Sequence, residues 1–439
     1  MVQNPKEGKM EWIPVSEDYD YHQEVARSAY ADMLHDYERN QKYHFALKAA
    51  IKKMHMLGKP AHVLDIGTGT GLLAMMAAKC GADSVVACEA FLPMAKCAAK
   101  VIEDNNLAEK ILIIPKRSTE LKVGNGGDML HRANILVTEV FDTELIGEGA
   151  IGTFNHAKKE LLEPNSIVVP SEATIYAQIV ECPVALAWHR PLSWVNEDEN
   201  FVISAPSRIL QCAGSAAVHD LQLSQLSENS FRPLVPPTPV FRFDWSCKDG
   251  LLPYKRSESI KVVASRSGTV QVVFMWWDLR MDEDGEIILS CAPFWAHPNY
   301  LHKKSSLTDS GLPWRDHWMQ AIYYLPSEMP VNQGERGLLK AYHDEYSLWF
   351  SYQNIISPES DAKDCNGVAL WVEWDLDGEN TISTGPLSIP SAGQTVSWDI
   401  HTRQGVRLLP SPLSLPFSFE ARFLSSTCDL SLSIKTNAA

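Results

Sequence analysis

The sequence predicts a Rossmann-like α/β domain followed by an antiparallel β-barrel domain. Over residues 61–170, short continuous apolar runs alternate with helical patterns, which is typical of a parallel sheet covered by helices on both faces. After Pro170, proline becomes frequent, tryptophan and tyrosine cluster, and helical periodicity largely vanishes. Alternating stretches such as Thr174–Val180 and Val272–Leu279 favour an antiparallel barrel or sandwich there. We therefore expect the boundary between the two domains near residue 170.

The elements of the first domain follow one another in a regular order. Residues 20–57 are predicted to be helical, and Gly58 ends that stretch. One later helix is expected to open at Thr70, and another has Pro93 near its first turn, where proline is tolerated. The predicted strands are Val63–Ile66, Val85–Cys88, Ile111–Ile114, Ile135–Thr138 and Ile167–Val169.

An internal repeat marks the second half of the chain. The segment Val273–Leu279 returns as Leu370–Leu376. Five further residues, Trp314, His317, Gln320, Leu325 and Pro326, recur at identical spacing as Trp398, His401, Gln404, Leu409 and Pro410. Chance similarity of amphipathic strands is the alternative explanation, but five matches at one constant offset favour a duplication. The second copy contains only the end of a β unit.

The composition is that of a soluble globular protein. Of its 439 residues, 45% are hydrophobic and 21% are charged, and this length suffices for two or three domains. The formal net charge of −15 makes nucleic acid an unfavourable direct partner and favours basic partners. Solubility alone accounts for the charge equally well.

The cysteines and the apolar runs indicate the compartment. Nine cysteines are scattered and include no Cys-x-x-Cys pair, which argues against a zinc site or a disulfide framework and for reducing surroundings. The N-terminal residues contain no apolar signal core, and no run approaches the ~18 apolar residues of a membrane span. We therefore expect a cytoplasmic or nuclear protein with no bound metal and no membrane partner.

A glycine-rich loop, Gly67-Thr-Gly69-Thr-Gly71, follows the first predicted strand and opens a helix. Glycines let the backbone turn tightly and approach a ligand closely. Glu89 ends the next strand, about 20 residues further on, where an acid can meet ribose hydroxyls. NAD binding is the alternative. However, Asp65 and the Gly-x-Gly-x-Gly spacing suit S-adenosylmethionine better, because that cofactor has no pyrophosphate and presents a cationic amino group.

Two glutamates, Glu139 and Glu148, follow the fourth predicted strand. Glu139 ends this strand at the carboxyl edge of the sheet, where open α/β sheets bind ligands. Paired carboxylates suit the planar, permanently charged guanidinium group, so the two glutamates indicate chemistry on arginine. The alternative is a solvated loop that carries several acids, because Asp142 and Glu144 lie between them.

Together these motifs resemble those of the protein arginine methyltransferases over roughly residues 10–355. The matching residues are Met33-Leu-His-Asp36 with Arg39, Val63–Gly71, Glu89, Glu139 with Glu148, and Asp316-His317-Trp318. The chain departs from the family in having Asp316 where the family has threonine. It also resembles one whole module and only the end of a second, whereas the member it resembles in particular has two complete modules. Thr402 stands in the second copy where the first has Trp318, so we assign that copy no catalysis.

The resemblance implies a role for each site residue. Glu139 and Glu148 would bind the substrate guanidinium, and His317 would pair with Asp36 to brace the N-terminal helix over the cofactor. Contacts with S-adenosylmethionine are implied for Arg39 at its carboxylate, for Asp65, Gly67 and Gly69 at its amino-acid end, for Glu89 at the ribose, and for Ser118 or Thr119 at the adenine edge.

The resemblance also implies four parts and an activity. The parts are N-terminal helices over the cofactor (1–60), a Rossmann-like methyltransferase domain (61–170), a β-barrel substrate domain with a dimerisation insertion (171–360) and a truncated second barrel (361–439). The implied activity is monomethylation of arginine in basic proteins such as histones, with S-adenosylhomocysteine as product and a homodimer as the expected assembly. The alternative is a catalytically weak or inactive interaction subunit, because the missing module would supply the pseudo-dimer surface.

Overall fold

The computed structural model describes residues 2–3, 10–11, 30–189, 194–196, 201–204, 217–227, 229–299, 318–355, 364–371, 373–375, 381–386, 396–397, 405–414, 417–424 and 429–436. The chain divides into two compact units, residues 1–354 and residues 355–439. A short antiparallel pair, β1 (Val2–Gln3) with β2 (Met10–Glu11), lies near the start of the first unit.

Two helices precede the parallel sheet, α2 (Tyr30–His35) and α3 (Tyr37–Met56). Asp36 separates them and caps α3, because its side chain accepts a hydrogen bond from the backbone N–H of Arg39 at 3.0 Å. The predicted helical stretch is thus confirmed from Tyr30 onwards, with a break at Asp36, and residues 20–29 lie outside the described part. The buried stripe of α3 has helical spacing and consists of Arg39, Tyr43, Ala46, Leu47, Ala50, Ile51 and Met54.

The Rossmann-like part is a five-stranded sheet in the order β5-β4-β3-β6-β7, and its pairings are parallel. The strands are β3 (His62–Ile66), β4 (Ser84–Cys88), β5 (Ile111–Ile114), β6 (Ala133–Thr138) and β7 (Leu162–Val169). All five predicted strands are therefore confirmed. The central strand β6 is buried along its whole length, as a strand covered on both faces must be.

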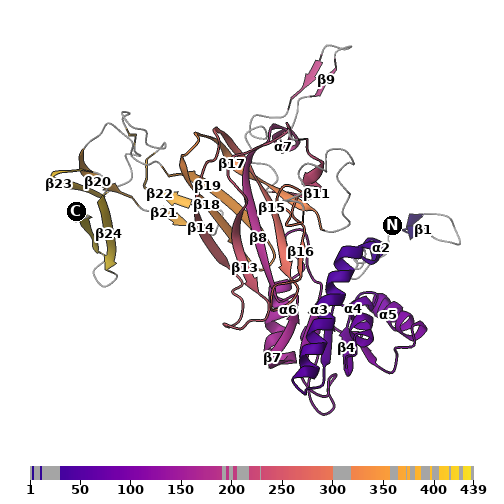
Figure 1. The fold of residues 1–439 in the computed structure, drawn as a ribbon. Helices are drawn as coiled ribbons and strands as arrows, with labels where there is room; N and C mark the ends of the chain where they lie inside the picture. Colours follow the sequence, from indigo (N-terminus) through magenta and orange to yellow (C-terminus); the bar gives the residue numbers. More distant parts are fainter. Residues whose placement is uncertain are drawn as a thin grey trace. The chain divides into compact units, whose positions relative to one another are not determined.

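The strand order reverses at β3, with β4 and β5 on one side of it and β6 and β7 on the other. The carboxyl ends of β3 and β6 therefore form the topological switch point, where open α/β sheets bind ligands. The helices around this sheet are α4 (Leu72–Lys79), α5 (Leu92–Asp104) and α6 (Ala150–His156) (Figure 1). A 3-10 turn, η1 (Ser118–Glu120), follows β5, and a π-helical turn, η2 (Ala157–Leu161), follows α6.

The start of α4 differs slightly from the prediction. The helix begins at Leu72 rather than at Thr70, because Gly71 is its N-cap and has left-handed backbone with φ of 85°. Pro93 lies in the first turn of α5, as expected.

Beyond Pro170 the first unit consists mainly of two antiparallel sheets (Figure 1). The larger has the order β11-β17-β15-β8-β12, with β13 beside β8 and β16 beside β15. Its strands are β8 (Glu172–Glu181), β11 (Ala217–Leu221), β12 (Arg232–Pro233), β13 (Thr238–Asp244), β15 (Gly268–Arg280), β16 (Ile288–Ser290) and β17 (Gln320–Val331). The smaller consists of β14 (Arg256–Val263), β18 (Arg336–His343) and β19 (Leu348–Asn354). The predicted class, a Rossmann-like domain followed by antiparallel β structure, is confirmed.

Short elements interrupt these sheets. They are the helix α7 (Pro183–His189), the hairpin β9 (Trp194–Asn196) with β10 (Phe201–Ile203), and the 3-10 turn η3 (Leu223–Gln225). Helical structure therefore does not end altogether at Pro170.

The central strand β15 is buried on both faces. On one face Trp276 stacks on Tyr176 of β8, with ring centroids 6.2 Å apart. On the other face Trp277 hydrogen-bonds the loop that follows β6. The second face is apolar because it packs against the Rossmann-like part.

The second unit contains three antiparallel strand pairs in its described residues. They are β20 (Asp364–Leu370) with β23 (Gly405–Ser414), β21 (Glu373–Asp375) with β22 (Thr381–Ser383), and β24 (Phe417–Leu424) with β25 (Asp429–Thr436). In the second copy of the repeat, Leu370 ends β20 and Glu373–Asp375 form β21, which pairs with β22. The pairing of β21 therefore does not repeat that of β15 with β17, and the duplication stays a prediction. The division of the chain at residues 60, 170 and 360 stays a prediction.

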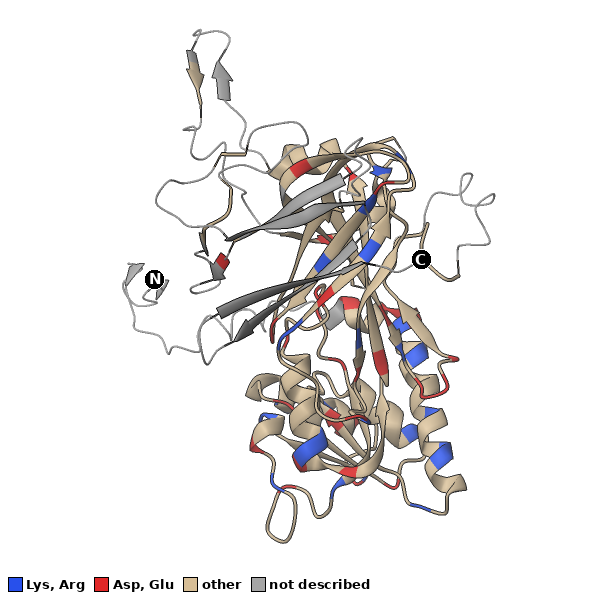
Figure 2. Cartoon of the chain, turned by 90° about the vertical axis from the view of Figure 1, so that its left-hand side faces the viewer, with Lys and Arg blue, Asp and Glu red and all other residues tan. Residues whose placement is uncertain are grey.

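Across the described residues, no helix is both long and apolar enough to cross a membrane. Acidic and basic residues are interspersed along the described chain in the view of Figure 2.

Candidate active site

The glycine-rich loop leaves the carboxyl end of β3 and turns directly into α4. Gly67, Gly69 and Gly71 have φ values of 71°, 54° and 85°, a left-handed backbone that side chains disfavour. The carboxylate of Glu89, at the end of β4, accepts the backbone N–H of Gly69 at 3.0 Å and that of Phe91 at 2.9 Å. Glu89 therefore fixes the loop as well as facing the edge at which a ribose is expected.

Asp65 is completely buried within β3. It accepts a hydrogen bond from the hydroxyl of Thr68 at 2.6 Å. Burial raises the pKa of Asp65 to about 7, against the opposing effect of its hydrogen bonds. A cationic group in front of the loop would lower this pKa again and favour the carboxylate.

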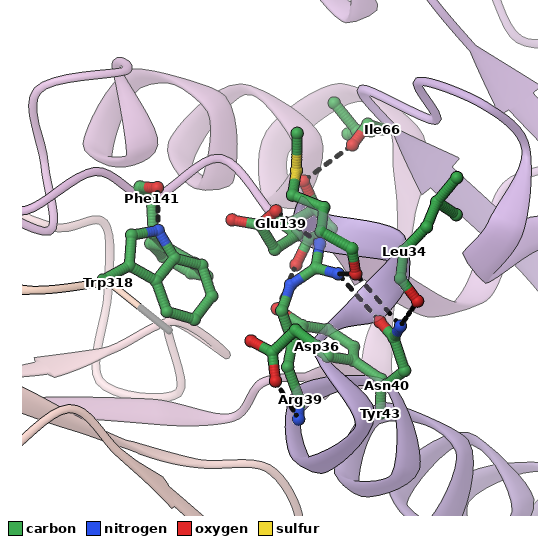
Figure 3. A network of polar contacts seen from close by, with 11 residues as sticks. Leu34, Asp36, Arg39, Asn40, Tyr43, Ile66, Glu139, Phe141 and Trp318 are labelled. Carbon is green, nitrogen blue, oxygen red and sulfur yellow. Dashed lines mark hydrogen bonds and ion pairs between the residues drawn. The ribbon is translucent and has the colours of Figure 1, made fainter. Parts of the chain in front are cut away.

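The guanidinium of Arg39 reaches from α3 to the carboxyl end of β6 and donates to Glu139 Oε2 at 2.6 Å (Figure 3). Both side chains are largely buried, with exposed fractions of 7% and 10%. The sequence assigned these two residues to different ligands, the cofactor carboxylate and the substrate guanidinium. The structure brings them into direct contact, so Glu139 holds a guanidinium group of the protein itself.

Neighbouring polar groups fix Arg39 in this position (Figure 3). Its Nη1 donates to Asn40 Oδ1 at 2.8 Å and to the backbone oxygen of Met33 at 3.2 Å. The amide of Asn40 in turn donates to the backbone oxygens of Met33 and Leu34, at 3.0 and 3.1 Å. Asn40 therefore joins the end of α2 to the guanidinium of Arg39. The rings of Tyr43 and Trp318 lie 5.7 and 5.8 Å from that guanidinium.

Tyr43 connects α3 to the sheet. Its hydroxyl donates to the backbone oxygen of Thr138 at 3.1 Å, and the hydroxyl of Thr138 donates to the backbone oxygen of Ile66 at 2.8 Å. These bonds link the ends of β3 and β6, so Arg39, Glu139 and the glycine loop belong to one rigid edge.

The loop from Glu139 to Glu148 is fastened to the antiparallel part of the first unit. The indole nitrogen of Trp318 donates to the Phe141 backbone oxygen at 2.7 Å. Glu144 accepts hydrogen bonds from the hydroxyl of Tyr323 and from the backbone N–H of Leu348, the latter at 3.2 Å. The loop is therefore not simply a solvated one with several acids, because Glu144 anchors it.

Glu148 lies at the far end of this loop. Its side chain retains an exposed surface, although much protein surrounds its carboxyl group. Desolvation, together with repulsion from Glu139 and Asp142, raises the pKa of Glu148 to about 8. Glu139 and Glu148 thus lie close enough to repel each other, which is the arrangement that a shared cation would relieve.

The remaining predicted residues are only partly described. His317 lies outside the described residues, so its pairing with Asp36 stays a prediction, and Asp36 itself is buried and caps α3. Ser118 and Thr119 lie on η1 beyond the carboxyl end of β5, with Ser118 buried and Thr119 exposed. Their contact with adenine also stays a prediction.

Four residues of the site were not identified from sequence as polar partners: Asn40, Tyr43, Trp277 and Trp318. Tyr43 lies one turn after Arg39 on the buried face of α3, which is a signal that could have found it. Asn40 directly follows Arg39, and no helical spacing marks it. No sequence signal indicates that Trp277 would reach the loop after β6.

The edge offers the chemical groups that S-adenosylmethionine requires. The buried Nε of Arg39 has no hydrogen-bond partner among the described residues, so a carboxylate there would satisfy it. Asp65 and Glu89 provide carboxylates for an ammonium group and for hydroxyls, and the loop glycines have the left-handed backbone that a tight turn requires. Within the described part of the chain, no cluster of three or more histidine, cysteine or acidic residues could hold a metal ion.

The chain matches two known families. Residues 44–144 match the family described as ribosomal protein L11 methyltransferase (PrmA), and residues 172–355 match the arginine methyltransferase oligomerization subdomain. The fold and these matches define a methyltransferase domain joined to the barrel of arginine methyltransferases.

Curated relatives refine this class. Protein arginine N-methyltransferase 7 of Aedes aegypti is 53% identical over 346 residues, which are 77% of this chain and 50% of the relative. The protein of the same name from Anopheles gambiae is 51% identical over 343 residues, 76% of this chain and 50% of the relative. The matched part of the chain belongs to the protein arginine N-methyltransferase family, and its relatives there are named protein arginine N-methyltransferase 7. The chain spans about half the length of these relatives.

A solved structure supports the fold. The Trypanosoma brucei PRMT1 enzyme-prozyme heterotetrameric complex with AdoHcy contains a chain that aligns with a TM-score of 0.57 at 17% identity. The alignment covers 75% of this chain and 99% of that one. At this level of identity the likeness concerns the fold alone.

Proposed function

We propose that the chain is an S-adenosylmethionine-dependent protein arginine N-methyltransferase. The observation that carries the proposal is that the glycine-rich loop, which leaves β3, and Glu139, which follows β6 and begins the segment leading to Glu148, lie at one switch point of the parallel sheet. The relatives' names support the same activity.

The cofactor would lie along the carboxyl edge of β3 and β4. Arg39 would hold its carboxylate, Asp65 and the backbone of Gly67 and Gly69 its amino-acid end, and Glu89 its ribose hydroxyls. Ser118 or Thr119 would meet the adenine edge. Bound there, S-adenosylmethionine supplies an electrophilic methyl group, which leaves sulfur as a guanidinium nitrogen of arginine bonds to it, and S-adenosylhomocysteine is the product.

Glu139 and Glu148 would orient the substrate rather than activate a neutral nucleophile. Arginine remains protonated at neutral pH, and its nitrogen lone pairs are delocalised. Two carboxylates that accept hydrogen bonds from the guanidinium hold positive charge on the nitrogens that do not react and aim the remaining one. As a carboxylate held against the guanidinium, Glu148 can also take up the proton that the methylated nitrogen releases.

The finer parts of the proposal concern product, substrate, assembly and location. We infer monomethylation (type III) of arginine in basic proteins such as histones, with no direct contact to nucleic acid. The net charge of −15 supports a basic substrate. The family resemblance supports monomethylation and a homodimer, and the scattered cysteines support action in the cytoplasm and nucleus.

A second candidate function is that of a catalytically weak interaction subunit. The family resemblance favours it, because a second module supplies the pseudo-dimer surface in the member that the chain resembles. Size-exclusion chromatography combined with a methyl-transfer assay separates the two functions. An active homodimer supports the enzyme, and an inert monomer supports the interaction subunit.

The decisive experiment is mass spectrometry of an arginine-glycine peptide after incubation with the protein and S-adenosylmethionine. Addition of one methyl group to arginine supports the proposed reaction and product, and Glu148→Gln serves as the inactive control. Calorimetry with S-adenosylhomocysteine tests the cofactor separately. Absence of both binding and transfer would overturn the proposal.

A further inference from the structure

Asp142 lies between the two glutamates and has no part in the function proposed above. Its Oδ1 accepts a hydrogen bond from the backbone N–H of Gly147 at 3.0 Å. This bond closes residues 142–147 into a loop that ends immediately before Glu148. The side chain of Asp142 therefore determines the position of Glu148.

Gly147 packs closely against the carboxylate of Asp142. A Cβ atom added at position 147 would overlap the carboxylate oxygens of Asp142. A side chain at 147 would thus open the loop or displace Asp142. The hydrogen bond to Asp142 therefore requires a residue without a Cβ atom at position 147.

The backbone of Asp142 is fixed independently of its side chain. The indole nitrogen of Trp277, from the buried strand β15, donates to the backbone oxygens of Asp142 and Thr143 at 3.2 and 3.1 Å. Because Trp277 holds the main chain at 142 and the carboxylate holds Gly147, the loop has a fixed start and a fixed end. A loop held at both ends can set the separation of Glu139 and Glu148.

Two negatively charged groups act on Glu148, whereas groups of both kinds act on Asp142. Asp142 and Glu139 are the two carboxylates that repel a charge on Glu148. Asp142 itself faces Glu144, which repels its charge, and His219 of β11 and the Gly147 N–H, which favour it. Asp142 thus contributes negative potential to Glu148 while it forms its own hydrogen bond.

We propose that Asp142 is a positioning residue for the carboxylate pair: it closes the 142–147 loop, places Glu148 opposite Glu139, and adds negative charge beside it. This inference rests on the proposed function, because it assigns a task within the same guanidinium site. Asp142 does not touch the substrate and acts through Glu148.

Two variants separate the shape of Asp142 from its charge. Asp142→Asn keeps an oxygen that can accept the Gly147 N–H, whereas Asp142→Ala removes the acceptor. The matched control is Asp128→Asn, because Asp128 also accepts a backbone N–H, that of Lys122 at 3.0 Å, in a turn outside the 139–148 loop. For each protein, kcat, KM and the pH profile are measured with an arginine peptide, and peptide affinity is titrated against pH in the presence of S-adenosylhomocysteine.

Asp142→Ala should lower kcat by at least about tenfold, since a displacement of ~1 Å can cost about 10²-fold. Asp142→Asn should keep most of kcat at alkaline pH, while the acidic limb of its profile moves to lower pH by about one unit. Asp128→Asn should leave both quantities unchanged. The inference would be overturned by a wild-type kcat in Asp142→Ala, or by an acidic limb in Asp142→Asn at the same pH as in wild type. If Asp142→Ala does not fold, the result for Asp142→Asn decides.

An inert wild-type protein would refute the proposed function and not the role of Asp142. In that case the binding titration decides. The role of Asp142 is supported if the rise in peptide affinity occurs at a lower pH in Asp142→Asn than in wild type. Identical titration curves for the two proteins contradict it.

Discussion

The guanidinium of Arg39 lies 2.6 Å from the carboxylate of Glu139, although the two residues are far apart in the sequence. Helix α3 supplies the cation and the end of strand β6 supplies the anion. The contact joins the residue expected to hold the cofactor to a residue expected to hold the substrate. A cofactor carboxylate at the unpartnered Nε of Arg39 would share the guanidinium with Glu139, which couples the two proposed ligands energetically.

Breaking this ion pair should destabilise the fold. Arg39→Met leaves the largely buried Glu139 carboxylate without its cation, at an expected loss of about 3–5 kcal/mol in the free energy of unfolding. The double variant Arg39→Met with Glu139→Gln should recover part of this loss, because no unpaired charge remains. Urea denaturation of the two single variants and the double variant measures the coupling. Strictly additive losses would show that the pair contributes nothing.

Glu148 should make the protein less stable as the pH rises. Its pKa is raised to about 8 from an ordinary value of 4.5. Between these values the unfolded chain has released a proton that the folded chain still binds, so the free energy of unfolding falls with increasing pH and levels off above about pH 8.

Glu148→Gln removes this dependence. The stability of the variant relative to wild type should therefore increase from about pH 5 to about pH 8 and then stay constant, as denaturation at several pH values can measure. Asp65, whose pKa is also raised, titrates in both proteins and cancels in the comparison. A difference that does not change with pH would contradict the raised pKa.

Asn40 should matter for cofactor binding through Arg39. Asn40→Ala removes the 2.8 Å hydrogen bond to the Arg39 guanidinium, and a bond to a charged group is worth about 1.5–3 kcal/mol. We expect the affinity for S-adenosylhomocysteine, measured by calorimetry, to fall by about tenfold or more. Asn105→Ala is the matched control. It also loses a hydrogen bond from a side-chain amide to a backbone oxygen, that of Val101, but at the C-terminal end of α5. Equal affinities of the two variants would argue against the role of Asn40.

The indole N–H of Trp318 should matter for methyl transfer more than for stability. Trp318→Phe keeps an aromatic ring beside Arg39 but loses the 2.7 Å bond to the Phe141 backbone oxygen. The loop between Glu139 and Glu148 is then less fixed, so kcat should fall by about tenfold while S-adenosylhomocysteine still binds. Trp295→Phe loses a comparable bond, to Gln178 within the barrel, and should retain kcat. A Trp318→Phe enzyme as fast as Trp295→Phe would contradict this role for the loop.

The sequence predicted the parallel sheet closely and the antiparallel part less so. The runs that became β3, β4, β5 and β6 are continuous and apolar, as is typical of a parallel sheet with helices on its faces, and this pattern is local. Strand β15 is continuously apolar from Val272 to Trp277 and buried on both faces, and its second face meets the loop after β6. Such a contact depends on how two domains meet, and no local pattern encodes it.

The sequence by itself determined the order of strands and helices, the left-handed glycine loop and the position of Glu139 at a strand end, because periodicity, glycine and chain direction act over a few neighbouring residues. Only the tertiary structure decided that Arg39 pairs with Glu139, that Trp277 and Trp318 fasten the loop, and that the pKa of Glu148 is raised. These properties arise from burial and from charges brought together by folding, and both depend on distances in space that spacing along the chain does not specify.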